Sequence, residues 1–176
     1  MFHPFAKVAV LACWLIAPAV AGEMPGISST DIRIGGIFPF SAPASSIGLI
    51  DRSILGYVQS INDCGGINGR KINYITYDDA YSPSNTVEQA RRLAEGDEVA
   101  LTFSQLGTAA NTATAKYLKS RGGSTIGIVS GSTKFTDVAQ FPLTITGLVS
   151  DDTEARTYTK YLVKTLACEI HDASSG

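Results

Sequence analysis

The sequence predicts an α/β protein with a doubly wound parallel sheet, in which helices cover both faces to give three αβα layers. Two observations support this prediction. Short segments that are apolar, or in which apolar and polar residues alternate, are followed along the chain by segments whose apolar residues recur every three or four positions. Paired glycines and isolated prolines separate these segments. Because strands that alternate with helices pair in parallel, we expect one sheet with helices on both faces.

The first predicted strand spans residues 32–38, where an alternating start leads into an apolar run that Pro39 stops. A helix is expected to follow from residue 47, because apolar residues then recur at spacings of three and four. They are Ile47, Ile50, Ile54, Val58 and Ile61. All five lie on one helical face, and Gly65-Gly66 ends the helix.

The second unit begins with an alternating strand at residues 71–77, which ends at Asp78-Asp79. Ser82-Pro83 starts its helix, which covers residues 85–95. A third strand is expected at residues 99–103, a third helix at 111–121 and a fourth strand at 125–129.

The pattern changes after the fourth strand. Residues 141–146 are interpreted as an extended crossing segment, and residues 150–154 as the cap of a helix that runs to Leu162 or Leu166. Residues 168–176 show no period.

The first 21 residues have the pattern of a cleaved secretory signal peptide. Lys7 precedes an apolar run, and Ala19-Val20-Ala21 is a small-residue cleavage site. Lipid attachment at Cys13 is an alternative, whereas a membrane anchor needs about 20 apolar residues and Pro18 interrupts this run. We therefore expect a periplasmic protein in which residues 22–30 form a leader.

Charge and composition exclude several classes of function. The 176 residues include 14 Lys and Arg and 16 Asp and Glu, a net charge of −2 without any run of like charge, so no nucleic-acid partner is expected. His3 and His171 lie near the termini, which disfavours a histidine-based catalytic or metal site, and no cofactor motif is present. Cys64 and Cys168 could pair in an oxidising compartment, but nothing in the sequence sets their geometry.

Ligands of open α/β sheets bind outside the carboxyl ends of the strands. Three of the four loops expected there are rich in small residues: residues 40–46, 104–108 and 130–133. Such loops let backbone N–H groups and hydroxyls approach a small anion at a helix N-terminus. Ordinary turn and capping chemistry is the alternative for each loop taken alone.

The remaining loop carries Asp78 and Asp79, and an acid pair at a strand end can bind magnesium. The alternative is structural: one aspartate caps the next helix or accepts hydrogen bonds from loop N–H groups. Because no phosphate-binding or hydrolase motif accompanies the pair, we expect neither a catalytic residue nor a metal site.

Three segments together resemble the periplasmic solute-binding proteins of ABC importers, and most nearly the leucine/isoleucine/valine-binding branch, the type 1 periplasmic binding proteins. They are residues 32–43, which match the family's first strand and following loop, residues 62–69 (NDCGGING) and residues 77–79 (YDD). Ala42 stands where the family usually has glycine. The resemblance runs from residue 31 to about residue 166.

The resemblance implies a ligand site at the third and fourth loops, where one of two closing lobes binds an amino acid or a related small carboxylate. The residues carried over by position are Ile47, Leu106, Gly107, Thr108, Gly131, Ser132 and Thr133. Thr133 matches a threonine that hydrogen-bonds the ligand. Ile47 stands where several relatives have an aromatic residue, and Gly107 stands where some have serine, which leaves a backbone donor there.

The function implied is that of the substrate-binding component of an ABC transporter, not an enzyme, for branched-chain amino acids or related small carboxylates. Its partner would be the membrane permease. Residues 31–147 would form the first lobe, and residues 148–176 the crossover and first helix of a truncated second lobe, so weak or no binding is expected. An exported ligand-sensing protein of the same fold is the alternative.

Overall fold

A computed structural model describes residues 24–41 and 44–174. One parallel sheet contains five strands in the order β2-β1-β3-β4-β5. The strands are β1 (Asp31–Phe38), β2 (Lys71–Asp78), β3 (Leu101–Phe103), β4 (Ser124–Ile128) and β5 (Thr144–Thr146). The helices are α1 (Leu49–Asp63), α2 (Pro83–Arg91), η1 (Arg92–Gly96), α3 (Thr108–Ser120), η2 (Thr133–Thr136) and α4 (Asp151–Ser174). This architecture confirms the predicted fold class.

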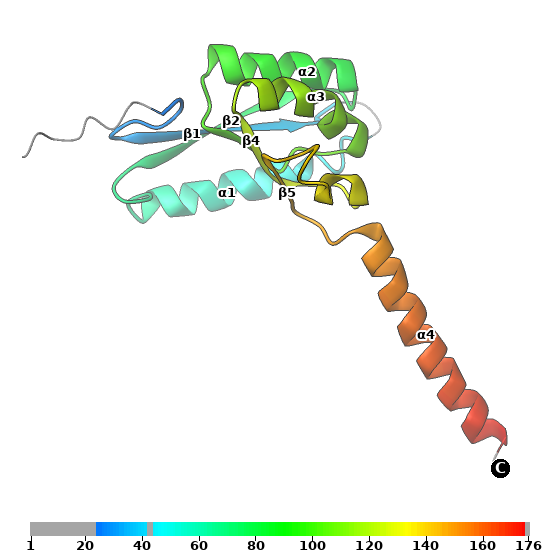
Figure 1. The fold of residues 1–176 in the computed structure, drawn as a ribbon. Coiled ribbons are helices and arrows are strands. Elements are labelled where there is room, and N and C mark those ends of the chain that lie inside the picture. Colours follow the sequence, from blue (N-terminus) through cyan, green and yellow to red (C-terminus); the bar gives the residue numbers. More distant parts are fainter. Residues whose placement is uncertain (1–23, 42–43, 175–176) are drawn as a thin grey trace, which may run out of the picture.

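Helices α2 and α3 cover one face of the sheet and α1 covers the other (Figure 1). The tightly packed core lies on the α2/α3 face, where Ile37 and Leu93 are fully buried. Gly35 also faces this side, and a Cβ atom there would lie 2.8 Å from Leu93 Cδ1. Phe135 and Phe141 extend the core toward β4 with an edge-on contact, their ring centroids 4.9 Å apart.

The α1 face is less closely packed. A cavity of about 410 Å³ separates α1 from the sheet, and apolar or aromatic side chains line it, with Ser53 as the exception. The predicted inward face of α1 is confirmed in direction, since Ile50, Ile54, Val58 and Ile61 all line this cavity. They are only partly buried, however, and Ile47 lies outside the helix with 44% of its surface exposed.

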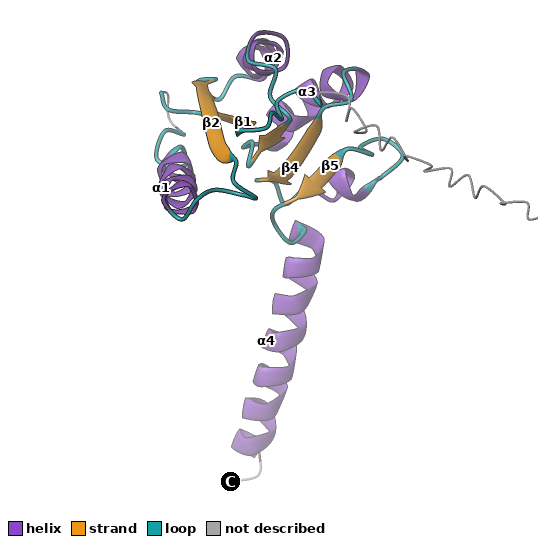
Figure 2. Ribbon diagram, turned by 90° about the vertical axis from the view of Figure 1, so that its left-hand side faces the viewer, coloured by secondary structure: helices purple, strands orange, loops and turns teal. Residues whose placement is uncertain are grey.

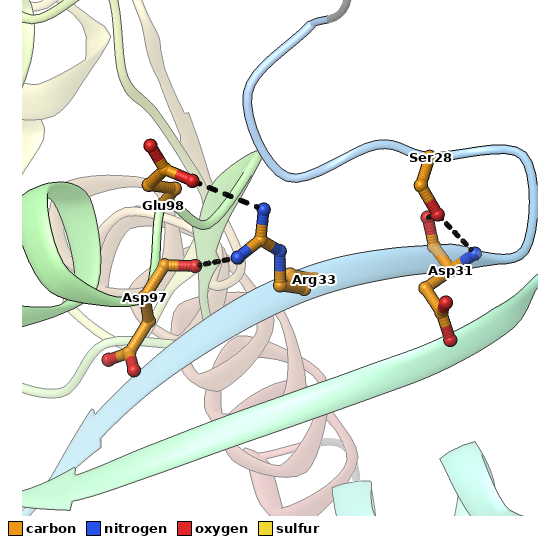
Figure 3. Close-up of polar contacts among 5 residues, drawn as sticks. All are labelled: Ser28, Asp31, Arg33, Asp97 and Glu98. Atoms are coloured by element: carbon orange, nitrogen blue, oxygen red, sulfur yellow. Dashed lines mark hydrogen bonds and ion pairs between the residues drawn. The ribbon is translucent and has the colours of Figure 1, made fainter.

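The segment before β1 is held against the sheet. Arg33 N–H donates to Gly26 O at 2.7 Å, and Ser28 Oγ accepts from Asp31 N–H at 2.9 Å. The Arg33 side chain reaches across to the turn before β3, where it donates to Asp97 O at 2.7 Å and lies beside Glu98 (Figure 3). These contacts fix the amino end of the sheet, opposite the predicted site. The predicted signal peptide, residues 1–21, lies outside the described residues.

Beyond the fourth strand the structure adds a strand that the sequence interpretation missed, and it corrects the predicted helix end at Leu162 or Leu166. The predicted crossing segment includes a fifth strand, because β5 pairs in parallel with β4. This strand has only three residues, too few for alternation to be recognised. The aperiodic end of the chain is helical to Ser174, because neither glycine nor proline interrupts residues 151–174 and a helix without a packed face needs no apolar period.

Helix α4 projects away from the rest of the molecule (Figures 1 and 2). Residues 151–164 are all exposed. Among the described residues, no helix combines the length and the apolar character needed to cross a bilayer.

Candidate functional site

The loops after β3 and β4 lie side by side at the carboxyl edge of the sheet. Gly107 N–H donates to Val129 O at 3.1 Å, and Val129 N–H donates to Gln105 O at 3.0 Å. These bonds bring the hydroxyls of Thr108 and Ser130 to 2.7 Å from each other. The two small-residue loops therefore share one polar surface at the start of α3.

Gly107 shapes this surface through its backbone. Its φ of +97° is a conformation that residues with a side chain rarely adopt, and it directly precedes α3. Because Gly107 N–H is already bonded to Val129 O, it is not free to bind a ligand in this conformation. The donors at this helix end are instead the N–H groups of the first turn of α3, which lack intrahelical acceptors.

A buried polar network supports the loop from below. Gln105 is fully buried and donates through Nε2 to Thr114 Oγ1 at 3.0 Å. Asn111 Nδ2 donates to Gln105 O at 3.0 Å and to Gly107 O at 2.8 Å. Both residues belong to or contact α3, so the helix holds the loop in place, with the Leu106 side chain buried beneath it.

The loop after β4 contributes three of the predicted residues. Ser132 N–H donates to Ser130 Oγ at 3.3 Å, and Thr133 begins η2 with an exposed side chain. Gly131 accepts from Asp151 N–H at 2.8 Å, and a Cβ atom on Gly131 would overlap the Asp151 carboxylate. The missing side chain at Gly131 therefore admits a carboxylate to the edge of the site.

Asp78 orders the loop after β1. Its carboxylate accepts from Phe40 N–H at 2.9 Å, from Ser41 Oγ at 2.6 Å and from Ala80 N–H at 2.9 Å. Desolvation by burial raises the pKa of this carboxyl, but the hydrogen bonds outweigh it and lower the pKa below the ordinary value. The charged form of Asp78 thus stabilises this loop.

Asp79 has a separate structural task. It is buried, accepting from Thr86 Oγ1 at 2.6 Å and from Tyr81 N–H at 2.9 Å. The two aspartates therefore follow the structural interpretation, with one receiving loop N–H groups and the other joining the next helix. Within the described part of the chain, no cluster of three metal-ligating side chains occurs.

Tyr81 is a site candidate that the sequence reasoning missed. It follows β2, is 54% exposed, and its Cε2 would lie 3.3 Å from a Cβ atom on Gly107. The sequence feature that could have identified Tyr81 is its position in one of the four loops at the carboxyl ends of the strands, two residues after Asp79. Ile47, in contrast, is exposed in the loop after β1, and no hydrogen bond among the described residues joins it to the Thr108–Ser130 pair.

Comparisons with known proteins agree with the fold. The periplasmic binding protein family model matches residues 31–168. The Leu/Ile/Val-binding protein homolog 7 of Brucella suis is 37% identical over 94 residues, which cover 51% of this chain and 23% of that protein. The chain therefore spans about a quarter of the length of the curated relatives it matches.

Two solved structures show the same fold. The substrate-binding periplasmic protein of Ralstonia solanacearum superposes with a TM-score of 0.71 at 25% identity, over 77% of this chain and 38% of that one. An ABC transporter substrate-binding protein of Desulfitobacterium hafniense, solved in complex with Leu, gives a TM-score of 0.67 at 23% identity, over 77% and 39% of the two chains.

Proposed function

The chain belongs to the periplasmic binding protein family, and from this premise we propose that it is the amino-acid-binding lobe of an ABC transporter's substrate-binding protein. The observation that carries the proposal is the Thr108–Ser130 hydroxyl pair, 2.7 Å apart at the start of a 13-residue helix. Hydroxyl donors and the positive end of a helix dipole together favour a carboxylate.

We infer that the ligand is a zwitterionic amino acid with an apolar side chain. Asp151 lies against Gly131 at the edge of the site, where its carboxylate can pair with an ammonium group. The exposed ring of Tyr81 beside Gly107 offers an apolar surface for the ligand's side chain. Relatives named for Leu/Ile/Val binding, and a relative solved with Leu, support a branched-chain amino acid.

The mechanism is noncovalent capture. Within the Thr108–Ser130 pair one hydroxyl donates to the other, so the pair keeps one proton to donate to the ligand carboxylate. Thr133 is placed to add a second hydroxyl donor, and Asp151 neutralises the amine. We propose weak binding, because the described residues contact the ligand from one side and exposed charged contacts contribute little. Export fits the signal pattern of residues 1–21, and the partner that receives the ligand is a membrane permease.

Calorimetric titration tests the proposal with leucine, isoleucine and valine at millimolar concentration. We expect a dissociation constant of about 1 mM, which corresponds to only about −4 kcal/mol. Thr108→Val and Ser130→Ala should each weaken leucine binding, whereas Thr112→Val, one turn further along α3, should not. Micromolar affinity would contradict the one-sided site, and equal binding by all three variants would contradict its location.

A second titration tests the ammonium contact. The analogue 4-methylpentanoic acid retains the carboxylate and the apolar tail of leucine but lacks the amine. We expect the analogue to bind the natural chain more weakly than leucine does. To the Asp151→Asn variant, which lacks the carboxylate that pairs with the amine, we expect the analogue and leucine to bind equally. Unchanged discrimination in Asp151→Asn would exclude Asp151 from the site.

A further inference from the structure

Tyr81 is held in an uncommon backbone conformation in the loop after β2. Its φ is +57° and that of Ala80 is +49°, values that residues with a side chain rarely adopt. Two such residues in a row cost conformational energy, so they persist only where their surroundings fix them. The contacts that fix the backbone of Tyr81 therefore decide where its ring lies.

The Asp79 carboxylate makes those contacts. Its Oδ1 accepts from Tyr81 N–H at 2.9 Å, and its Oδ2 accepts from Thr86 Oγ1 at 2.6 Å. The Asp79 carbonyl also accepts from Ser82 N–H at 2.9 Å and from Asn85 Nδ2 at 3.3 Å. Asp79 is only 1% exposed and Thr86 is fully buried in α2, so this junction is closed within the described chain. Asp79 thus ties Tyr81 to the buried side of α2.

The ring of Tyr81 lies along Gly107. A Cβ atom on Gly107 would be 3.3 Å from Tyr81 Cε2 and 3.7 Å from the Tyr81 hydroxyl oxygen, so the edge of the ring borders the glycine. The next residue is Thr108, whose hydroxyl lies 2.7 Å from that of Ser130. The ring therefore borders the residue next to the hydroxyl pair that is proposed to bind the ligand carboxylate.

The hydroxyl pair itself is held without Asp79. Its two loops are joined by the bond from Gly107 N–H to Val129 O at 3.1 Å, and Asn111 Nδ2 donates to Gly107 O at 2.8 Å. Within residues 24–41 and 44–174, no hydrogen bond connects Asp79 to the loops after β3 and β4. A change at Asp79 should therefore move the ring and leave the carboxylate site in place.

We propose that Asp79 is a positioning residue for the specificity of this site: it holds the Tyr81 ring beside Gly107, and the ring makes the site prefer amino acids with large apolar side chains. The proposal rests on the proposed function, since it takes the ligand carboxylate to bind at the hydroxyl pair. Asp79 does not touch the ligand and acts only through Tyr81, whose ring gives the ligand side chain an apolar surface.

The test is the preference of the chain for leucine over alanine, measured by following chemical shifts during titration with each amino acid. We expect the natural chain to bind leucine about tenfold more tightly than alanine. Asp79→Ala removes the acceptor for Tyr81 N–H, so the preference should fall to about twofold, with little change in the affinity for alanine. Asp79→Asn retains an oxygen that can accept this bond and should keep most of the preference.

Two further variants separate positioning from general damage to the fold. Thr86→Val is close to isosteric and removes only the donor to Asp79 Oδ2, so it should lower the preference even if Asp79→Ala does not fold. In a Tyr81→Ala background, Asp79→Ala should lower the preference no further, because both changes act through one ring. Equal losses of affinity for leucine and alanine in Asp79→Ala, or a full preference in both Asp79→Ala and Thr86→Val, would overturn the proposal.

A measurement without ligand separates this proposal from the proposed function. The ring current of Tyr81 shifts the Hα resonances of Gly107. Tyr81→Ala and Asp79→Ala should therefore move these resonances alike, and Asp79→Asn should leave them in place. A natural chain that binds neither amino acid would overturn the proposed function and the specificity role with it, whereas Gly107 resonances that stay unchanged in Asp79→Ala would overturn the positioning role alone.

Discussion

The two faces of the sheet differ in how they are held. On the α2/α3 face, Ile37 and Leu93 are fully buried, and the packing is close enough that Gly35 has no room for a side chain. On the α1 face, Ile54 and its neighbours are only partly buried around a cavity. Polar contacts replace apolar packing there: Asn62 Nδ2 donates to Ile72 O at 2.8 Å, and Asp78 holds the loop after β1.

The two faces therefore contribute differently to the stability of the fold. The closed face supplies the apolar burial that drives folding, and α3 on that face positions the candidate ligand loops. The open face buries less apolar surface, because a cavity remains under α1, although Ile72 is buried there and a Cβ atom on Gly36 would lie 2.4 Å from the Tyr74 hydroxyl. Mutations should therefore affect the two faces very differently.

The largest contrast is expected for matched truncations. Leu93→Ala removes a fully buried side chain and should lower the free energy of unfolding by about 2–5 kcal/mol. Ile54→Ala borders the existing cavity and should cost about 1 kcal/mol, because only part of its surface leaves water on folding. Urea unfolding of both variants measures the difference, and equal losses would show that the faces are packed alike.

Alanine substitutions at two glycines, one on each face, should change the stability of the fold in opposite directions. Gly35→Ala should destabilise by about 1–3 kcal/mol, since the new Cβ would press against Leu93. Gly56→Ala should stabilise by about 0.5–1 kcal/mol, because this mid-helix position of α1 has no atom within 4 Å of the added Cβ. Thermal unfolding distinguishes them, and a stable Gly35→Ala variant would contradict the close packing.

The smallest expected effect concerns the polar support of the open face. Asp78→Asn should cost about 1 kcal/mol at neutral pH, because solvent screens this exposed carboxylate. The lowered pKa means that the charged form stabilises the fold above the ordinary value of 3.8, and that this stabilisation is lost as the pH falls through the folded value. When unfolding is measured from pH 7 downward, the difference in the free energy of unfolding between the natural chain and Asp78→Asn should disappear below about pH 4. A stability difference that does not change with pH would show that the loss of stability does not come from the charge of the Asp78 carboxylate.

Much of this architecture could be predicted from the sequence. Local patterns of nearby residues were enough to predict three features. They are the end of the first strand at Pro39, the helix face from Ile50 to Ile61 and the structural role of Asp78. The third helix, in contrast, begins at Thr108 instead of residue 111, because a glycine with positive φ starts it and its first polar turn has no apolar period.

Contacts between distant loops could not be predicted. The bond from Gly107 N–H to Val129 O removes a donor that the sequence offers to a ligand, and it depends on two strands being neighbours. Tyr81 is likewise placed beside Gly107 by the sheet order.

The central claim is that the ligand binds at the loops after β3 and β4 and not in the apolar groove beneath α1. Amide chemical shifts of the labelled chain, followed while leucine is added to millimolar concentration, test it most directly. We predict saturating changes at Thr108 and at Ser130 to Thr133, with Tyr57 and Val58 unchanged. Changes confined to the α1 groove, or none at the two loops, would contradict the account.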